Sequence, residues 1–303
     1  MDRLPRMRIC KGGERIMVKI FTKSYWKNNW AKALGQFFIH LTMAILLFCM
    51  IYPFLMSVWC AFKTTVEYDI SKFYPTFPLK LSNVSSAFDE VGGYMFNTVA
   101  VAVFGVVGSL FIASLASFAF ATMRFPGKKI FFMMVICLMM IPGCLTLVPQ
   151  FLLYKNLNLN NKLIAVLLPQ LTVQPIGQVF LLTMVFSALP RDLFNAAEID
   201  GANPFQVYTN VAIPVSIPIL VTQAIMQING LWNDYLWPMT VISTNYEALT
   251  ISAGLVIELR TQYSQNMPIT YAGYLIASLP LVCIFLFGNK FYIQGLMSSS
   301  IKM

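Results

Sequence analysis

A series of long apolar runs with almost no charge is the feature that most constrains this 303-residue chain. A helix needs about 20 residues to cross about 30 Å of hydrocarbon, and each run is long enough to do so. A backbone in lipid must satisfy its own hydrogen bonds, and the alternation of a barrel strand is absent, so the runs predict helices. The six predicted spans are Gln36–Phe62, Met95–Ala121, Ile130–Leu153, Leu163–Ser187, Ile213–Ser243 and Ile269–Phe291.

The composition agrees with a membrane location. Apolar residues make up 58% of the chain and charged residues only 11%, whereas a soluble domain has about 25% charged residues. We therefore predict an all-α membrane protein, a bundle of six transmembrane helices.

The distribution of basic residues predicts the orientation of the bundle. Of the 21 lysines and arginines, 15 fall on one set of alternating connections and six on the other. The richer set is expected in the cytosol, together with both termini. Residues 1–35 then form a basic cytosolic arm, residues 36–293 the membrane domain and residues 294–303 a cytosolic tail. This bias explains the net charge of +9, so no nucleic-acid partner is expected.

Two connections on the outer side are long, residues 63–94 and residues 244–268. The first holds two prolines and four acidic residues and predicts a surface loop with one short helix. Nine prolines lie within or at the ends of the predicted spans. Because each proline favours a kink, they indicate a bundle that encloses a cavity and rearranges.

The sets of residues that enzymes use are missing from the sequence. The single histidine, His40, is expected at the edge of the first span, and the six cysteines are scattered without a CxxC pair. The sequence contains no HExxH, GxSxG or phosphate-loop motif, and Asp234 is the only carboxylate at a plausible membrane depth. We therefore expect no catalytic residue, no metal and no cofactor bound by this chain.

A polar segment, "LPRDLFNAAEIDGANPFQVYTNVAIPVS", interrupts the second half of the chain at Leu189–Ser216. Pro190 suits the first turn of a helix, and Gly201 suits its left-handed end. Asn203 and Pro204 are typical of an N-cap and first turn, so a second helix is predicted at once. The segment should form two short helices at a thin bend on the cytosolic side.

This bend has the features of a helix that fits a groove on a partner protein. Its expected apolar anchors are Leu193, Phe194, Phe205 and Tyr208. The alternative is a helix that lies against lipid headgroups. Such helices are usually basic, whereas the first predicted helix has one arginine beside three acidic residues.

At this point the sequence resembles a known family. "NAAEIDGA", followed after ten residues by "IP", resembles the EAA loop of inner-membrane permease subunits in type I ATP-binding-cassette (ABC) importers. "MRFPGKK", "MMIPGCLTLVPQFLLYKNLNLNNK", "WNDYLWP" and "FYIQGL" resemble its carbohydrate-uptake branch, in particular the smaller permease of the maltose and glycerol-phosphate type. The resemblance covers roughly residues 45–303.

The resemblance implies the type I importer permease fold and a non-catalytic subunit that imports a sugar or oligosaccharide through the bacterial plasma (inner) membrane. The implied partners are a second permease subunit, a cytosolic ABC ATPase dimer that binds ATP and Mg, and an extracytoplasmic solute-binding protein. Membrane lipid would surround the spans. The implied task is to couple ATPase closure to alternating access of the bundle.

The resemblance also implies roles for residues. The coupling loop is residues 189–213, and the residues that would contact the ATPase are Asn195, Ala196, Ala197, Glu198, Asp200, Gly201, Ala202, Pro204 and Phe205. Asn195 stands where the family usually has glutamate, and Glu198 lies one helical turn away. In the tail, Gln294, Gly295 and Leu296 would contact the ATPase.

The stretch "WNDYLWP" has two interpretations. In the first, Trp232, Tyr235 and Trp237 could stack on sugar rings while Asn233 and Asp234 bind hydroxyl groups. The candidates for the substrate pathway are Trp232, Asn233, Asp234 and Tyr235. The alternative is an aromatic belt at the outer membrane surface. At the level of the whole chain, the rival to an importer subunit is a self-contained secondary transporter, whose repeats with broken helices are not clear in the sequence.

Overall fold

The computed structural model describes residues 30–261 and 266–300. The chain divides into two compact units, Met1–Met56 and Ser57–Met303. The described part of the first unit belongs to one helix, α3 (Trp30–Ala61), whose last residues enter the second unit. The first unit also contains His40, whose ring nitrogen lies 2.7 Å from the Gln36 carbonyl oxygen. Residues 1–29, which make up most of the predicted cytosolic arm, lie outside the described residues.

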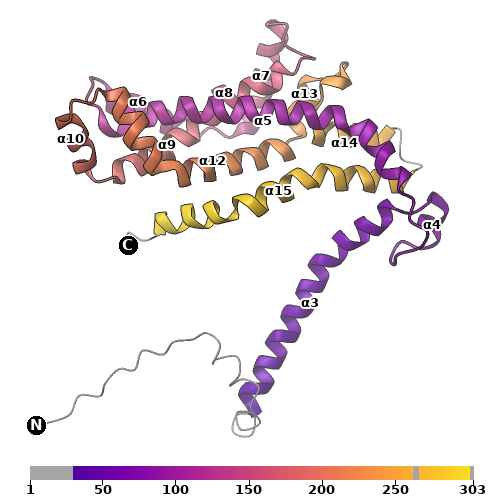
Figure 1. Cartoon of the computed structure of the whole chain (residues 1–303). Coiled ribbons are helices and arrows are strands. Elements are labelled where there is room, and N and C mark those ends of the chain that lie inside the picture. The colour runs from indigo at the N-terminus through magenta and orange to yellow at the C-terminus, as the bar shows by residue number, and fades with distance from the viewer. Residues whose placement is uncertain (1–29, 262–265, 301–303) are drawn as a thin grey trace, which may run out of the picture. The chain divides into compact units, whose positions relative to one another are not determined.

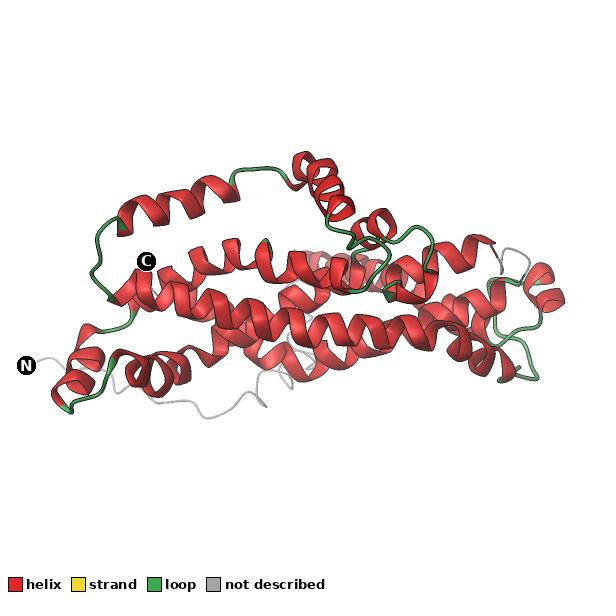
Figure 2. Ribbon diagram, turned by 90° about the horizontal axis from the view of Figure 1, so that it is seen from above, coloured by secondary structure: helices red, strands yellow, loops and turns green. Residues whose placement is uncertain are grey.

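The second unit is built around one very long helix, α5 (Ser82–Thr122). At 1.5 Å per residue its 41 residues extend about 60 Å, twice the thickness of the hydrocarbon layer. Helices α8 (Ile164–Thr172), α9 (Gln174–Ala188), α12 (Ile213–Asn233) and α15 (Met267–Ser300) all contact α5. Figure 2 shows the long helices of the bundle running beside one another.

The described residues contain five helices that are long and apolar enough to span a membrane, or six if one bent pair counts as a span. The bent pair is α6 (Lys128–Met139) and α7 (Gly143–Asn156), which meet at 96°. The predicted third span, Ile130–Leu153, is therefore not one helix. Pro142 explains the break, because it stands at the N-cap of α7 in extended backbone and lacks an amide hydrogen.

Other boundaries also differ from those predicted. The loop expected over residues 63–94 ends at Leu81, just before α5 begins, although it does contain the expected short helix, α4 (Thr65–Ile70). The fifth span was predicted to reach Ser243, but α12 ends at Asn233 and α13 (Leu236–Val241) follows. The loop expected over residues 244–268 contains η2 (Tyr246–Ala248) and α14 (Ile251–Thr261).

Helix α14 is part of the core. Ile251 and Ala253 are fully buried, and the Ile251 amide donates to the Thr98 hydroxyl of α5 over 2.7 Å. The Asn97 side chain of α5 donates to the carbonyl groups of Glu247 and Leu249, which precede α14. The sequence predicted only a connection here, and the structure has a helix that packs against α5 and α15 near one end of the bundle (Figure 1).

A buried lysine organises the connection between α3 and α5. The Lys63 ammonium donates to the carbonyl oxygens of Ser71 and Tyr74, and its side chain is 1% exposed. Next to it, Thr64 and Glu67 form a capping box at the start of α4. The hydrogen bonds that Glu67 accepts from the Thr64 amide and hydroxyl hold the pKa of this carboxyl below its usual range.

Glutamines link the long helices inside the bundle. The Gln227 side-chain oxygen on α12 accepts from Ser109 of α5 (2.7 Å) and from Gln178 of α9 (2.9 Å). Its nitrogen donates to Gln170 of α8 over 3.2 Å. One side chain therefore ties α12 to α5 and to both halves of the span that is interrupted at Val173.

We expect Gln227→Leu to lower the midpoint of thermal unfolding of the detergent-purified protein by a few degrees. The substitution leaves the Gln178 nitrogen and the Gln170 oxygen without this partner, at about 1–3 kcal/mol for an unsatisfied buried group. Gln174→Leu makes the same change at an exposed position of α9 and should have little effect. Equal midpoints for the two variants would contradict the linking role of Gln227.

Candidate functional site

The polar segment forms two short helices joined by a glycine turn. Helix α10 (Arg191–Ile199) begins after Pro190, and Gly201 follows it in the left-handed region with φ +79°. Helix α11 (Pro204–Val207) starts at once, and the Asn203 side chain accepts from the Gln206 amide over 2.9 Å. The Gln206 side chain in turn accepts from the Asn203 amide. The helix starts and the left-handed glycine agree with the sequence prediction.

An aromatic cluster holds this bend to the bundle. Phe118, near the end of α5, packs against Phe186, Phe194 and Tyr208, with ring centres 5.5–6.4 Å apart. The Tyr208 hydroxyl lies 2.7 Å from the hydroxyl of Ser114. Because Tyr208 begins η1 (Tyr208–Ala212), which leads directly into α12, the bend contacts both α5 and α12. Helix α10 is therefore connected to two long helices through the aromatic cluster and η1.

The outer side of the bend is exposed. Most of the residues with an implied ATPase contact are exposed, namely Asn195, Ala196, Glu198, Asp200, Gly201, Pro204 and Phe205, and Ala197 and Ala202 are half-buried. The structure thus brings the set together on one short bend. It sits at one end of the bundle, far along α5 from α14 (Figure 1).

The structure corrects the prediction of the apolar anchors. Phe194 and Tyr208 are buried in the protein's own core and are unavailable to a partner, whereas Leu193 and Phe205 are exposed. Ile199 is 86% exposed and was missed from the sequence. Its spacing of four residues from Asn195, on the same helix face, is the signal that could have identified it.

A cavity of about 520 Å³ lies beneath the bend. Its walls come from the end of α5, including Thr122, from Arg124 just beyond it, and from the two short helices, including Glu198 and Pro204. This space separates the two short helices from the end of α5.

The four residues of the predicted substrate pathway do not share one surface. Trp232 is 4% exposed, and its ring nitrogen donates to the Ala277 carbonyl of α15 over 3.0 Å. It therefore does not present a face for sugar stacking. The Asp234 carboxylate accepts from the backbone amide of Trp237, in the first turn of α13. Only Asn233 and Tyr235 are exposed.

The predicted tail contacts, Gln294, Gly295 and Leu296, lie in the last part of α15. Their side chains are outside the described set, and residues 301–303 are outside the described chain.

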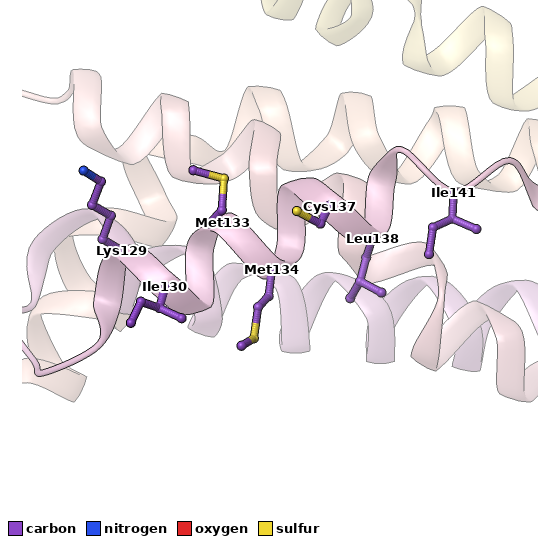
Figure 3. A pocket seen from close by; sticks show the side chains of 7 residues that line it. All are labelled: Lys129, Ile130, Met133, Met134, Cys137, Leu138 and Ile141. Carbon is purple, nitrogen blue, oxygen red and sulfur yellow. The ribbon is translucent and has the colours of Figure 1, made fainter.

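An open apolar face on α6 is a weaker candidate. Figure 3 shows the side chains, from Lys129 to Ile141, that line this face. The open space beside them has a volume of about 610 Å³. All of them come from α6 and the residues just after it, so no second element completes a binding site. Because no residue of α6 is buried, this face is suited to lipid or a partner helix.

Among the described residues there is no group of three or more His, Cys, Asp or Glu side chains that could hold a metal ion.

Comparison with known proteins identifies the relatives of the chain. A family described as "Binding-protein-dependent transport system inner membrane component" matches residues 105–295. The chain is 32% identical over 265 residues to the arabinooligosaccharides transport system permease protein of Halalkalibacterium halodurans. The matched region covers 86% of this chain and 94% of that protein.

Two solved structures have a similar fold. One is a bacterial ABC transporter involved in the import of the acidic polysaccharide alginate, with a TM-score of 0.76 and 19% identity over 86% of this chain and 98% of that chain. The other is a bacterial alginate ABC transporter in complex with an alginate pentasaccharide-bound periplasmic protein, with a TM-score of 0.62 and 16% identity over 88% and 96% of the two chains.

Proposed function

Because this chain belongs to the family of binding-protein-dependent transport system inner membrane components, we propose that it imports an oligosaccharide by coupling ATPase closure to movement of its bundle. It is a multi-pass permease of the bacterial inner membrane. The alternative of a self-contained secondary transporter is not favoured by this family.

The exposed bend formed by α10 and α11 is the observation that carries the coupling proposal. Its outer side offers small residues, carboxylates and the exposed apolar side chains of Leu193, Ile199 and Phe205. Its inner side is fixed by Phe194 to the aromatic cluster on α5. A partner bound outside would therefore move the ends of α5 and α12 together.

The proposed partner at the bend is a cytosolic ABC ATPase dimer, which binds ATP and Mg and performs all hydrolysis. A second permease subunit would complete the pathway, and an extracytoplasmic solute-binding protein would deliver the sugar. The alginate transporter solved with a loaded periplasmic protein supports the last of these partners. The tail of α15 is a second proposed contact with the ATPase.

The substrate class follows from the relatives. The Halalkalibacterium halodurans protein belongs to a transport system for arabinooligosaccharides, and the structural neighbour imports a polysaccharide. We therefore propose an oligosaccharide of a few sugar rings as the substrate.

A reconstituted complex tests this function. The tagged chain would be co-expressed with the second permease, ATPase and binding protein encoded beside it, and the complex placed in proteoliposomes. We expect the ATPase to co-purify, its ATP hydrolysis to rise several-fold with sugar-loaded binding protein, and labelled arabinotriose or a related oligosaccharide to accumulate. Purification without an ATPase, or hydrolysis indifferent to the binding protein, would contradict the proposal.

A further inference from the structure

One face at the end of α12 is both polar and exposed. Asn229 and Asn233 lie four residues apart, and Gly230 and Met226 occupy the same face. All four residues are exposed. They occupy the last two turns of a helix that has no acidic or basic residue, at the end farthest from the α10–α11 bend.

Lipid is an unsuitable neighbour for this face. Side-chain amides need hydrogen-bond partners, and hydrocarbon offers none. The described part of the chain does not cover the two asparagines, so they face either a water-filled path or another protein.

The hydrogen bonds of the pair fix the direction of both amides. The Asn233 nitrogen donates to the Asn229 backbone carbonyl over 2.8 Å and to the Asn229 side-chain oxygen over 3.0 Å. Since these two oxygens can only accept, the Asn233 nitrogen must face them. The Asn229 nitrogen and the Asn233 oxygen then remain for an outside group.

One free donor beside one free acceptor matches a sugar hydroxyl pair. One hydroxyl oxygen can accept from Asn229 while its neighbour donates to Asn233. An uncharged oligosaccharide offers such pairs on every ring, and its apolar C–H faces need apolar walls.

The space beside the pair has such walls. A cavity of about 550 Å³ lies between α12 and α15, and Asn229 is its polar lining residue among apolar side chains such as Met226, Val282 and Phe285. A volume of this size is in the usual range for small-molecule sites. Next to it, a Cβ added at Gly230 would meet no heavy atom within 4 Å, so this face is open.

We propose that Asn229 and Asn233 form a site that binds the hydroxyl groups of an uncharged oligosaccharide on its way through the bundle. The proposal rests on the proposed function, and it adds both the site and the absence of charge on the substrate. The described walls of the cavity and α12 offer no lysine or arginine to an acidic sugar. The buried Trp232 does not contribute to this site.

Three substitutions in the assembled, reconstituted complex test the proposal. The probes are labelled arabinotriose as the neutral sugar and a labelled alginate oligosaccharide as the acidic one. Asn229→Ala and Asn233→Ala should each lower neutral-sugar uptake about five- to tenfold, while co-purification of the partners stays at wild-type levels. Gly230→Trp should abolish uptake, because it fills the open face.

Gly93→Trp is the matched control. Gly93 is an exposed glycine of α5 that also has no heavy atom within 4 Å of an added Cβ, so the same bulk there should leave uptake unchanged. ATP hydrolysis stimulated by the loaded binding protein should persist in all variants, since the bend is untouched.

The other outcomes would contradict either the proposed site or the proposed function. Loss of the second permease from the Gly230→Trp complex would show that the face is a protein interface and overturn the proposal. Wild-type uptake by the two asparagine variants, or preference of the wild-type complex for the acidic probe, would overturn it as well. Absence of any sugar-stimulated hydrolysis in the wild-type complex would instead contradict the proposed function.

Discussion

Gly201→Asp is expected to uncouple the transporter. Gly201 stands at φ +79°, where a side chain costs about 1–2 kcal/mol. The new carboxylate would join Asp192, Glu198 and Asp200 on the exposed bend and repel a partner shaped for small residues. We expect at least a tenfold loss of co-purified ATPase, together with loss of sugar uptake.

Two controls separate the backbone effect from the effect of charge. Gly201→Asn has nearly the same size, tolerates a positive φ and adds no charge, so it should retain most of the ATPase. No heavy atom lies within 4 Å of an added Cβ at Gly201, so the bundle itself should remain inserted in every variant. Wild-type ATPase binding by Gly201→Asp would refute the docking role of this bend.

Gly254→Ala is expected to destabilise the bundle although alanine favours helices. Gly254 lies in α14, and an added Cβ would lie 2.4–2.8 Å from three ring carbons of Tyr94 on α5. Overpacking of this kind costs about 1–3 kcal/mol and opposes the gain in helix propensity of about 1 kcal/mol. We expect a lower unfolding midpoint and a reduced yield of the detergent-purified protein.

A glycine of the neighbouring helix provides a control, because alanine there should not lower the stability. At Gly273 of α15, an added Cβ would make only ordinary contacts, at 3.5 Å and 3.7 Å, so Gly273→Ala should be neutral or stabilising. In a Tyr94→Ala background, Gly254→Ala should no longer lower stability, because the ring that it displaces is gone. A loss of stability that persists in this background would exclude close packing of α14 on Tyr94.

The local signals in the sequence were reliable where glycine and proline restrict the backbone. Pro190, Gly201 and Pro204 set the start and end of two short helices, and the structure places those helices accordingly. Pro142 was expected to kink a span, but the 96° bend at that point depends on what α6 and α7 pack against. A proline removes a hydrogen bond without choosing the resulting angle.

The burial of individual side chains was less predictable. Leu193 and Phe194 are adjacent apolar residues on one helix, yet one is exposed and the other belongs to the aromatic cluster. Trp232 was a candidate for sugar stacking, but it is buried, while Asn229 was not identified and lies on the open face. Composition gives the types of residue present, and the rotation of each helix determines which of them are accessible.

The sequence by itself determined the class of the protein. Its apolar runs require membrane helices, because lipid offers no hydrogen-bond partners to backbone N–H and C=O groups. Its motifs, in their order along the chain, indicated the importer family. Only the tertiary structure decided that α14 belongs to the core, that Phe194 faces inward and that two asparagines share an open face. These features depend on contacts between residues far apart in the chain, such as Thr98 with Ile251, and such contacts leave no local pattern in the sequence.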